Sequence, residues 1–217
     1  MMQKRGKLVT YILVGVNIAL LLVLGTLYLK QIKIRQELQE GIAQKVLRFH
    51  VLANSDSEED QALKLAVRDA VGEQMAGLLA GAETKEACEE LVEAHLEEIE
   101  QTAEAVLAAE GCSYEVHASI GETDFPVKTY GSYTFPEGTY EALNVVIGEG
   151  AGHNWWCVMY PNMCFAGSVY EVTDEGTEET LREILSEEEY RAVLSSGNYE
   201  VHFKYLSFLL DYFDENR

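Results

Sequence analysis

Hydrophobic residues predominate near the start of the chain, and no charged residue interrupts them. Residues 8–29 form 22 consecutive positions without a formal charge, and basic residues flank this run on both sides. About 20 apolar residues are enough for an α-helix to cross a bilayer. We therefore predict a membrane-spanning helix over residues 8–29. A cleavable signal peptide is the alternative, although the run is long for one and lacks an A-x-A cleavage site.

After this run the pattern changes to short amphipathic segments. Residues 31–44 are amphipathic and predict a stalk that extends the membrane helix. Residues 46–53 alternate as a half-buried β-strand does. We expect one face of this strand on the core and the other to carry polar groups. The expected core face is Leu47, Phe49, Val51 and Ala53, and the other face is Val46, Arg48, His50 and Leu52.

Two long helices are predicted next. Ser55 and Glu58 have capping-box spacing, which predicts a helix over residues 57–79. Helical spacing of apolar residues predicts a second helix from about Thr84 to about Ala109, with an outer face made mostly of Glu. The alternating acids near Asn54 are also typical of a calcium loop, but the Gly and Glu that such a loop requires are missing.

The stretch from Asn144 to Cys164 holds two apolar runs of strand length around Gly148, Gly150 and Gly152. We predict an antiparallel hairpin whose return strand ends at Pro161, which cannot donate to a ladder. The glycines do not have the G-x-G-x-x-G spacing of a dinucleotide-binding turn, and no helix follows them.

A further strand is predicted over residues 113–120, and Pro and Gly divide residues 125–138 into an extended segment and a turn. Helices are predicted over residues 177–185 and from Ser186, where Ser186 and Glu189 have the spacing of a capping box. The tail is expected to dock on the sheet through an apolar stripe of Tyr205, Leu206, Phe208, Leu209, Tyr212 and Phe213. The predicted fold class is therefore α+β: an N-terminal transmembrane helix, then an antiparallel sheet packed with two long helices and C-terminal helices. We expect a cytoplasmic tail and anchor over residues 1–35, a stalk over 36–44 and one domain over 45–217.

Charge narrows the possible functions. The chain carries a formal net charge of −21, and all 37 acidic residues follow residue 35. Nucleic-acid binding requires cationic residues that face phosphates, so a nucleic-acid partner is not expected. The same acidity opposes a domain that lies flat on an anionic membrane. We expect the acidic domain to be extracytoplasmic, where paired cysteines persist.

Four cysteines divide into two pairs of different kinds. Cys157 and Cys164 flank Pro161 at a tight reversal, within the range that a disulfide spans. We predict a disulfide between them. Cys88 and Cys112 lie near opposite ends of one predicted helix, roughly 36 Å apart, and are expected to be free.

No constellation of residues predicts catalysis or a metal site. The five His residues are scattered, with neither H-E-x-x-H nor Cys-x-x-Cys spacing. We expect no cofactor and no small-molecule substrate. An extracytoplasmic hydrolase remains an alternative if His50, His117 and an acid meet in space. A surface-binding module is a second alternative if Trp155 and Trp156 are exposed stacking platforms.

Two long motifs resemble a known family. LRFHVLANSDSEEDQALKLAVRDAV (47–71) and KTYGSYTFPEGTYEALNVVIGEGAGHNWWCVMYPNMCF (128–165) are similar to stage II sporulation protein R of endospore-forming Gram-positive bacteria, and the likeness extends to GNYEVHFKYLSFL in the tail. The resemblance implies a signalling protein exported from the forespore. Its partner would be a membrane-embedded aspartic protease of the mother-cell membrane, which cleaves the precursor of a mother-cell sigma factor. An uncleaved anchor would hold the chain in the forespore inner membrane, and cleavage would release it into the intermembrane space.

We expect the partner surface to combine the first strand–helix junction with the central hairpin. The junction supplies Arg48, His50, Asn54 and Asp56, and the hairpin supplies Asn154, Trp155 and Trp156. Adjacent strand residues point to opposite faces, so at most one Trp easily enters the core of a one-faced sheet. The other is free to anchor a partner, a role in which Trp is enriched.

Overall fold

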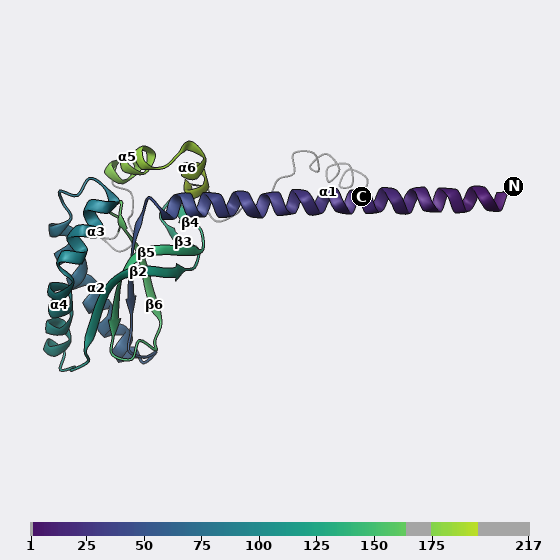
Figure 1. Ribbon diagram of the computed structural model, residues 1–217. Coiled ribbons are helices and arrows are strands. Elements are labelled where there is room, and N and C mark those ends of the chain that lie inside the picture. Colours follow the sequence, from purple (N-terminus) through teal and green to yellow (C-terminus); the bar gives the residue numbers. More distant parts are fainter. Residues whose placement is uncertain (1, 164–174, 195–217) are drawn as a thin grey trace, which may run out of the picture.

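A single helix, α1 (Met2–Ala43), contains both the apolar run and the stalk and projects far from the other elements (Figure 1). The computed structural model describes residues 2–163 and 175–194. From Tyr11 to Leu29 every side chain is exposed, and within the described residues this is the one helix long and apolar enough to cross a membrane. Such a helix serves as a membrane anchor or as a signal sequence. Its last turn enters the body, where Ile42 is fully buried.

The main sheet has four strands in the order β2, β5, β1, β6. These strands are β1 (Leu47–Leu52), β2 (Val116–Phe125), β5 (Gly138–Ile147) and β6 (Asn154–Tyr160). β1 pairs in parallel with β5 and antiparallel with β6, while β2 and β5 are antiparallel. The α+β fold class with an antiparallel-dominated sheet is confirmed.

The predicted hairpin over residues 144–164 is wrong. Its two strands exist as β5 and β6, but β1 lies between them and pairs with both. The Gly-rich loop therefore crosses the end of β1 and does not close a two-stranded ribbon. β1 takes the central position because nearly all of it is buried on both faces, which an edge strand does not require.

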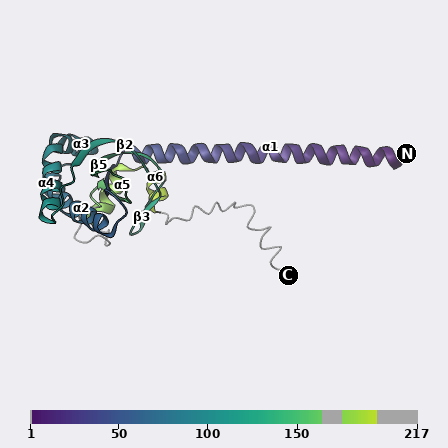
Figure 2. The same ribbon diagram turned by 90° about the horizontal axis from the view of Figure 1, so that it is seen from below.

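Three helices cover one face of this sheet: α2 (Glu58–Leu78), α3 (Lys85–Ala94) and α4 (Leu96–Ala109). Their apolar stripes join the inward residues of β1 and β5 in one core that includes Phe49, Val67, Ile99 and Val145. Figure 2 shows α3 and α4 on the side of the body away from the helix α1.

Two details of these helices differ from prediction. Ser57, and not Ser55, caps α2, because its hydroxyl accepts from the Asp60 amide at 3.1 Å. The single helix predicted over residues 84–109 is two helices, since His95 leaves helical geometry at φ −120°. The break lets α3 and α4 take different directions over the same sheet face.

The other face of the sheet is also covered. A second core contains the end of α1, α5 (Glu175–Ile184), α6 (Glu187–Leu194) and a small sheet of β3 (Lys128–Tyr130) and β4 (Tyr133–Phe135). The predicted capping box at Ser186 is confirmed by reciprocal hydrogen bonds with Glu189. This layer buries the face of β1 that was predicted to carry polar groups, including Arg48 and His50. Cys164 and the apolar stripe of the tail lie outside the described residues.

Candidate functional site

The loop from β1 into α2 and the loop from β5 to β6 meet at one end of the main sheet. Backbone hydrogen bonds of 3.0 Å join them, from the amides of Ala151 and Gly152 to the carbonyls of Asn54 and Ala53. The structure thus brings together the two regions that the sequence assigned to one partner surface. We call this junction of the two loops the loop pair.

Glycines permit this close approach. A β-carbon on Gly152 would lie 2.2 Å from the Ser55 carbonyl oxygen, far inside contact distance. Gly148 has φ +56°, and a β-carbon there would lie 2.4 Å from Oδ1 of Asn54. Only glycine fits a position with both a left-handed backbone and no room for a side chain.

Asp60 holds the first loop in shape. Its Oδ2 accepts from Asn54 Nδ2 at 2.9 Å and from Ser55 Oγ at 2.5 Å. These hydrogen bonds, that from Ser55 first and that from Asn54 second, lower the pKa of the Asp60 carboxyl. Oδ1 of Asn54 accepts from the Glu149 amide at 3.0 Å, so the same residue also fixes the second loop.

His50 links three strands beneath the loop pair. Its Nδ1 lies 2.9 Å from Oδ1 of Asn144 on β5, and its Nε2 lies 2.5 Å from the Asn154 side chain on β6. Oδ1 of Asn144 also accepts from Thr123 Oγ1 at 2.8 Å, which fixes the amide and makes Nδ1 of His50 a donor. With both nitrogens engaged and 6% exposure, His50 is a positioning residue.

The two tryptophans lie on opposite faces of β6, as predicted. Trp155 faces the helical layer, with Phe49 edge-on at 5.5 Å and the Arg68 guanidinium 5.2 Å from the indole. Trp156 faces the other layer and stacks on the His50 ring at 4.1 Å with an angle of 8°. Both tryptophans are half-buried, so each has an internal partner and keeps part of its surface accessible.

Charged groups line the outer rim of the loop pair. The Asp56 carboxylate contacts Nδ1 of His153, and both side chains are largely exposed. Lys64 on α2 donates to the His153 carbonyl oxygen at 3.0 Å and to Gln61 Oε1 at 2.6 Å. Burial lowers the pKa of Lys64. Lys64 thus links the helix α2 to the loop between β5 and β6.

Arg48 is fully buried in the second core, although the sequence placed it on the partner surface. Its guanidinium lies over four aromatic rings, at 4.2 Å from Phe125, 4.9 Å from Tyr140, 5.3 Å from Phe135 and 5.8 Å from Tyr130. Nε donates to the Cys157 carbonyl at 2.8 Å, and Nη2 donates to Tyr130 Oη at 3.0 Å. Burial lowers the pKa of this guanidinium.

The surface of the loop pair is therefore smaller than the predicted set. Asp56 and Asn154 are exposed and Asn54, Trp155 and Trp156 are half-buried, while Arg48 and His50 lie beneath them. Sequence reasoning missed Asp60 and Asn144. Asp60 stands three residues after Ser57, the spacing of an N-cap pair, and Asn144 is a polar residue inside the apolar strand ALNVVI. Both signals are visible in the sequence.

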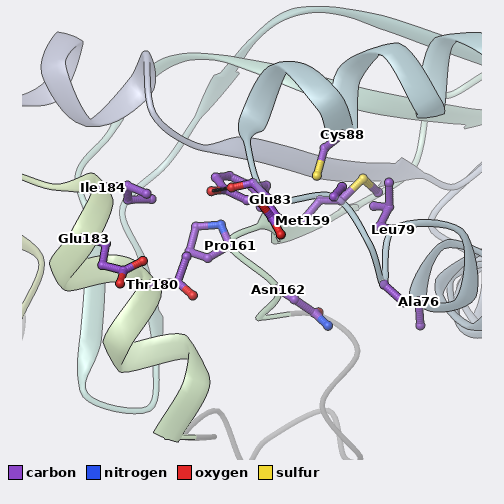
Figure 3. Close-up of a pocket in the computed structure, with 13 residues that line it drawn as sticks. Ala76, Leu79, Glu83, Cys88, Met159, Pro161, Asn162, Thr180, Glu183 and Ile184 are labelled. Atoms are coloured by element: carbon purple, nitrogen blue, oxygen red, sulfur yellow. Dashed lines mark hydrogen bonds between the residues drawn. The ribbon is translucent and has the colours of Figure 1, made fainter.

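A separate pocket of about 520 Å³ lies where the end of β6 meets α2, α3 and α5 (Figure 3). Cys88, Met159, Pro161, Thr180 and Glu183 are among its lining residues. Cys88 and Cys112 are free thiols. Burial, with nearby Glu89 and Glu86, raises the pKa of the Cys88 thiol to about 11, so it is protonated and a poor nucleophile at neutral pH.

The geometry does not support the two alternative functions. His50 faces amides and an indole, whereas His117 is exposed and contacts Glu100 at 3.2 Å, so the hydrolase set of two His and an acid is not assembled. Neither indole is a free platform. Among the described residues, no group of three or more His, Cys, Asp and Glu is placed to hold a metal ion.

Comparison with known proteins points to one family. The family model for stage II sporulation protein R (spore_II_R) matches residues 43–170, which include every predicted partner residue. Stage II sporulation protein R of Bacillus subtilis (strain 168) is 36% identical over 124 residues, covering 57% of this chain and 55% of the relative. The chain thus spans about half the length of the curated relative that it matches. No solved structure matches it significantly.

Proposed function

The chain belongs to the stage II sporulation protein R family and has a role in sporulation, and on this premise we propose that it is a signal exported from the forespore. Across the intermembrane space it switches on a membrane-embedded aspartic protease of the mother-cell membrane. That protease then processes the precursor of a mother-cell sigma factor. The chain acts by binding and performs no chemistry of its own.

One observation carries this proposal beyond the family match. The helix α1 joins the apolar stretch to the folded body without a break, since it runs from the exposed apolar residues to Ile42 in the second core. A chain that enters a membrane through α1 therefore carries the acidic body to the membrane surface. This arrangement supports either presentation from the forespore inner membrane or release after cleavage.

The loop pair is the surface that we assign to the protease. It presents the exposed residues Asp56 and Asn154 and the half-buried residues Trp155 and Trp156. Aromatic and amide groups of this kind are typical of protein-binding surfaces. A hydrogen bond to His50 holds the Asn154 side chain, and a hydrogen bond from Asn54 to Asp60 holds the adjoining loop, so less ordering entropy is lost when a partner binds.

The test is complementation of a sporulating strain that lacks the chain. Asp56 is replaced by Ala together with Trp155→Ala, and export and folding are checked before precursor cleavage is followed by immunoblot. The matched control is Glu73→Ala, which removes an exposed acid from α2. We expect cleavage to fall in the double variant and to continue in the control.

Two outcomes contradict different parts of the proposal. Normal cleavage in the strain without the chain refutes the function itself. Normal cleavage with the exported double variant refutes the assignment of the loop pair and leaves the function standing.

A further inference from the structure

The strand β2 forms one edge of the main sheet, and alternate residues on it point their backbone groups away from β5. In an antiparallel pair, residues that exchange ladder hydrogen bonds alternate with residues that do not. Gly148 N donates to Glu115 O at 2.9 Å, so Glu115 belongs to the paired set. The even-numbered residues of β2 therefore direct both the amide and the carbonyl outward.

The helix α4 covers the first half of this edge with carboxylates. Glu100 Oε1 accepts from the Ala118 amide at 2.8 Å, and Glu104 Oε1 accepts from the Val116 amide at 3.5 Å. These two contacts confirm that even-numbered amides face outward. They also satisfy donors that an edge strand otherwise presents to solvent.

The second half of the edge has no such cover. Within residues 2–163 and 175–194, the outward backbone groups of Ile120, Glu122 and Asp124 have no hydrogen-bond partner. Glu122 and Asp124 are exposed, and a β-carbon on Gly121 would meet nothing within 4 Å. Three residues in extended geometry thus present one donor and one acceptor each to open space.

The charge beside this open edge defines what can pair with it. Glu122 lies opposite Glu141 in the ladder. The nearby cation, Lys85, is already shared between Glu141 at 3.0 Å and Glu89 at 2.7 Å. Glu122 therefore lacks a cationic partner in the described part of the chain. Cross-strand pairs of opposite charge stabilise a sheet, and like charges placed opposite each other destabilise it.

A second copy of the chain is a poor occupant. Antiparallel pairing of two β2 edges centred on Glu122 would set this carboxylate against its own copy. An extended segment with Lys or Arg at alternate positions places cations against Glu122 and Asp124 instead.

We propose that residues 120–124 of β2 accept an extended, Lys- or Arg-bearing segment of the partner protease as an added strand. The identity of this partner rests on the proposed function. Backbone hydrogen bonds supply the docking and the acids select a basic strand, as in β-strand addition.

Proline at position 122 tests the edge without touching the ladder. Glu122→Pro removes an outward amide, while the inward amides of Gly121 and Thr123 stay paired with β5. Proline is tolerated on edge strands where its position faces solvent. In the complemented strain we expect precursor cleavage to fall about tenfold, because a backbone hydrogen bond and a charge contact are lost.

Charge reversal supplies a second variant that keeps the backbone unchanged. Glu122→Lys with Asp124→Lys should reduce cleavage at least as far, and it decides the question if the proline variant is not exported. The matched control, Glu98→Lys with Glu97→Lys, makes the same change of net charge on the exposed face of α4 and should leave cleavage intact.

Photo-crosslinking identifies the occupant. A benzophenone amino acid replaces Glu122, and a second version carries it at Glu98. A crosslink from position 122 to a basic segment of the protease supports the inference. A crosslink from position 122 to a second copy of the chain overturns the inference, and so does a crosslink to the protease from position 98 alone. Normal precursor cleavage in strains that carry either edge variant, with both variants exported, also overturns it. Normal cleavage in the strain that lacks the chain refutes the proposed function, and this is read without any edge variant.

Discussion

Replacing Gly152 by alanine is expected to push the loop pair apart. The new β-carbon would lie 2.2 Å from the Ser55 carbonyl oxygen and 2.5 Å from its carbon. Both are backbone atoms, so neither can rotate away and one loop must move. The movement breaks the hydrogen bond from Gly152 to Ala53 and strains its neighbour from Ala151 to Asn54.

The size of the effect follows from these contacts. Overpacking costs about 1–3 kcal/mol, and each backbone hydrogen bond contributes about 0.5–1.5 kcal/mol net. We expect the free energy of unfolding to fall by about 3 kcal/mol. For a chain of this size that corresponds to a melting temperature lowered by about 6–12 °C.

The assay is thermal unfolding of the full chain in detergent, followed by circular dichroism. Gly77→Ala is the control, because a β-carbon there meets nothing within 4 Å and Gly77 is the penultimate residue of the helix α2. That variant should be at least as stable as the unaltered chain, because alanine favours the helical conformation more than glycine does. If Gly152→Ala has the same melting temperature as the unaltered chain, the two loops do not approach each other as closely as described.

Three further predictions concern acid stability, the cysteines and topology. The pKa of Asp60 is lowered by folding, so its contribution to stability is present above an ordinary aspartate pKa of about 3.9 and is lost as the pH falls from there towards the lowered value. Asp60→Asn should flatten this loss in urea unfolding measured from pH ~2 to ~6; an unchanged acid limb would contradict it. Non-reduced peptide mapping of the exported protein should find Cys157 joined to Cys164, and recovery of Cys157 as an alkylated thiol would argue against the bond. Protease added to intact spheroplasts should digest residues 36–217, whereas full protection until lysis would place the domain inside.

Local sequence patterns predicted the individual strands and helices better than they predicted which strands pair with each other. The alternation of residues 46–53 and the apolar spacing of residues 57–79 depend on side chains close in sequence, and β1 and α2 are observed there. The hairpin failed because its strands pair with β1, about 100 residues earlier in the chain. The sequence of residues 144–164 alone does not indicate that β1 lies between β5 and β6.

The burial of residues in the candidate site also depends on side chains that are distant in sequence. Arg48 sits on a polar strand face, which favours solvent exposure when the strand is considered alone. Its aromatic surroundings come from Phe125, Tyr130, Phe135 and Tyr140, far along the chain. Such rings, and hydrogen bonds donated by the guanidinium nitrogens, stabilise a buried cation. The sequence around Arg48 does not indicate that these rings will surround it.

The unbroken helix α1 makes the body a rigid extension of whatever holds its apolar part. Residues 30–42 continue the helix for roughly 20 Å at 1.5 Å per residue, and Gln39 and Ile42 fasten its end to the body. A helix transmits rotation as well as distance, since each residue turns the chain by about 100°. Lengthening this segment by one residue would therefore swing the loop pair about a quarter turn around the helix axis, whereas seven residues would restore its bearing at greater reach. If the apolar part of α1 is held in a membrane, residues 30–42 fix the orientation of the loop pair about the helix axis as well as its distance from the bilayer.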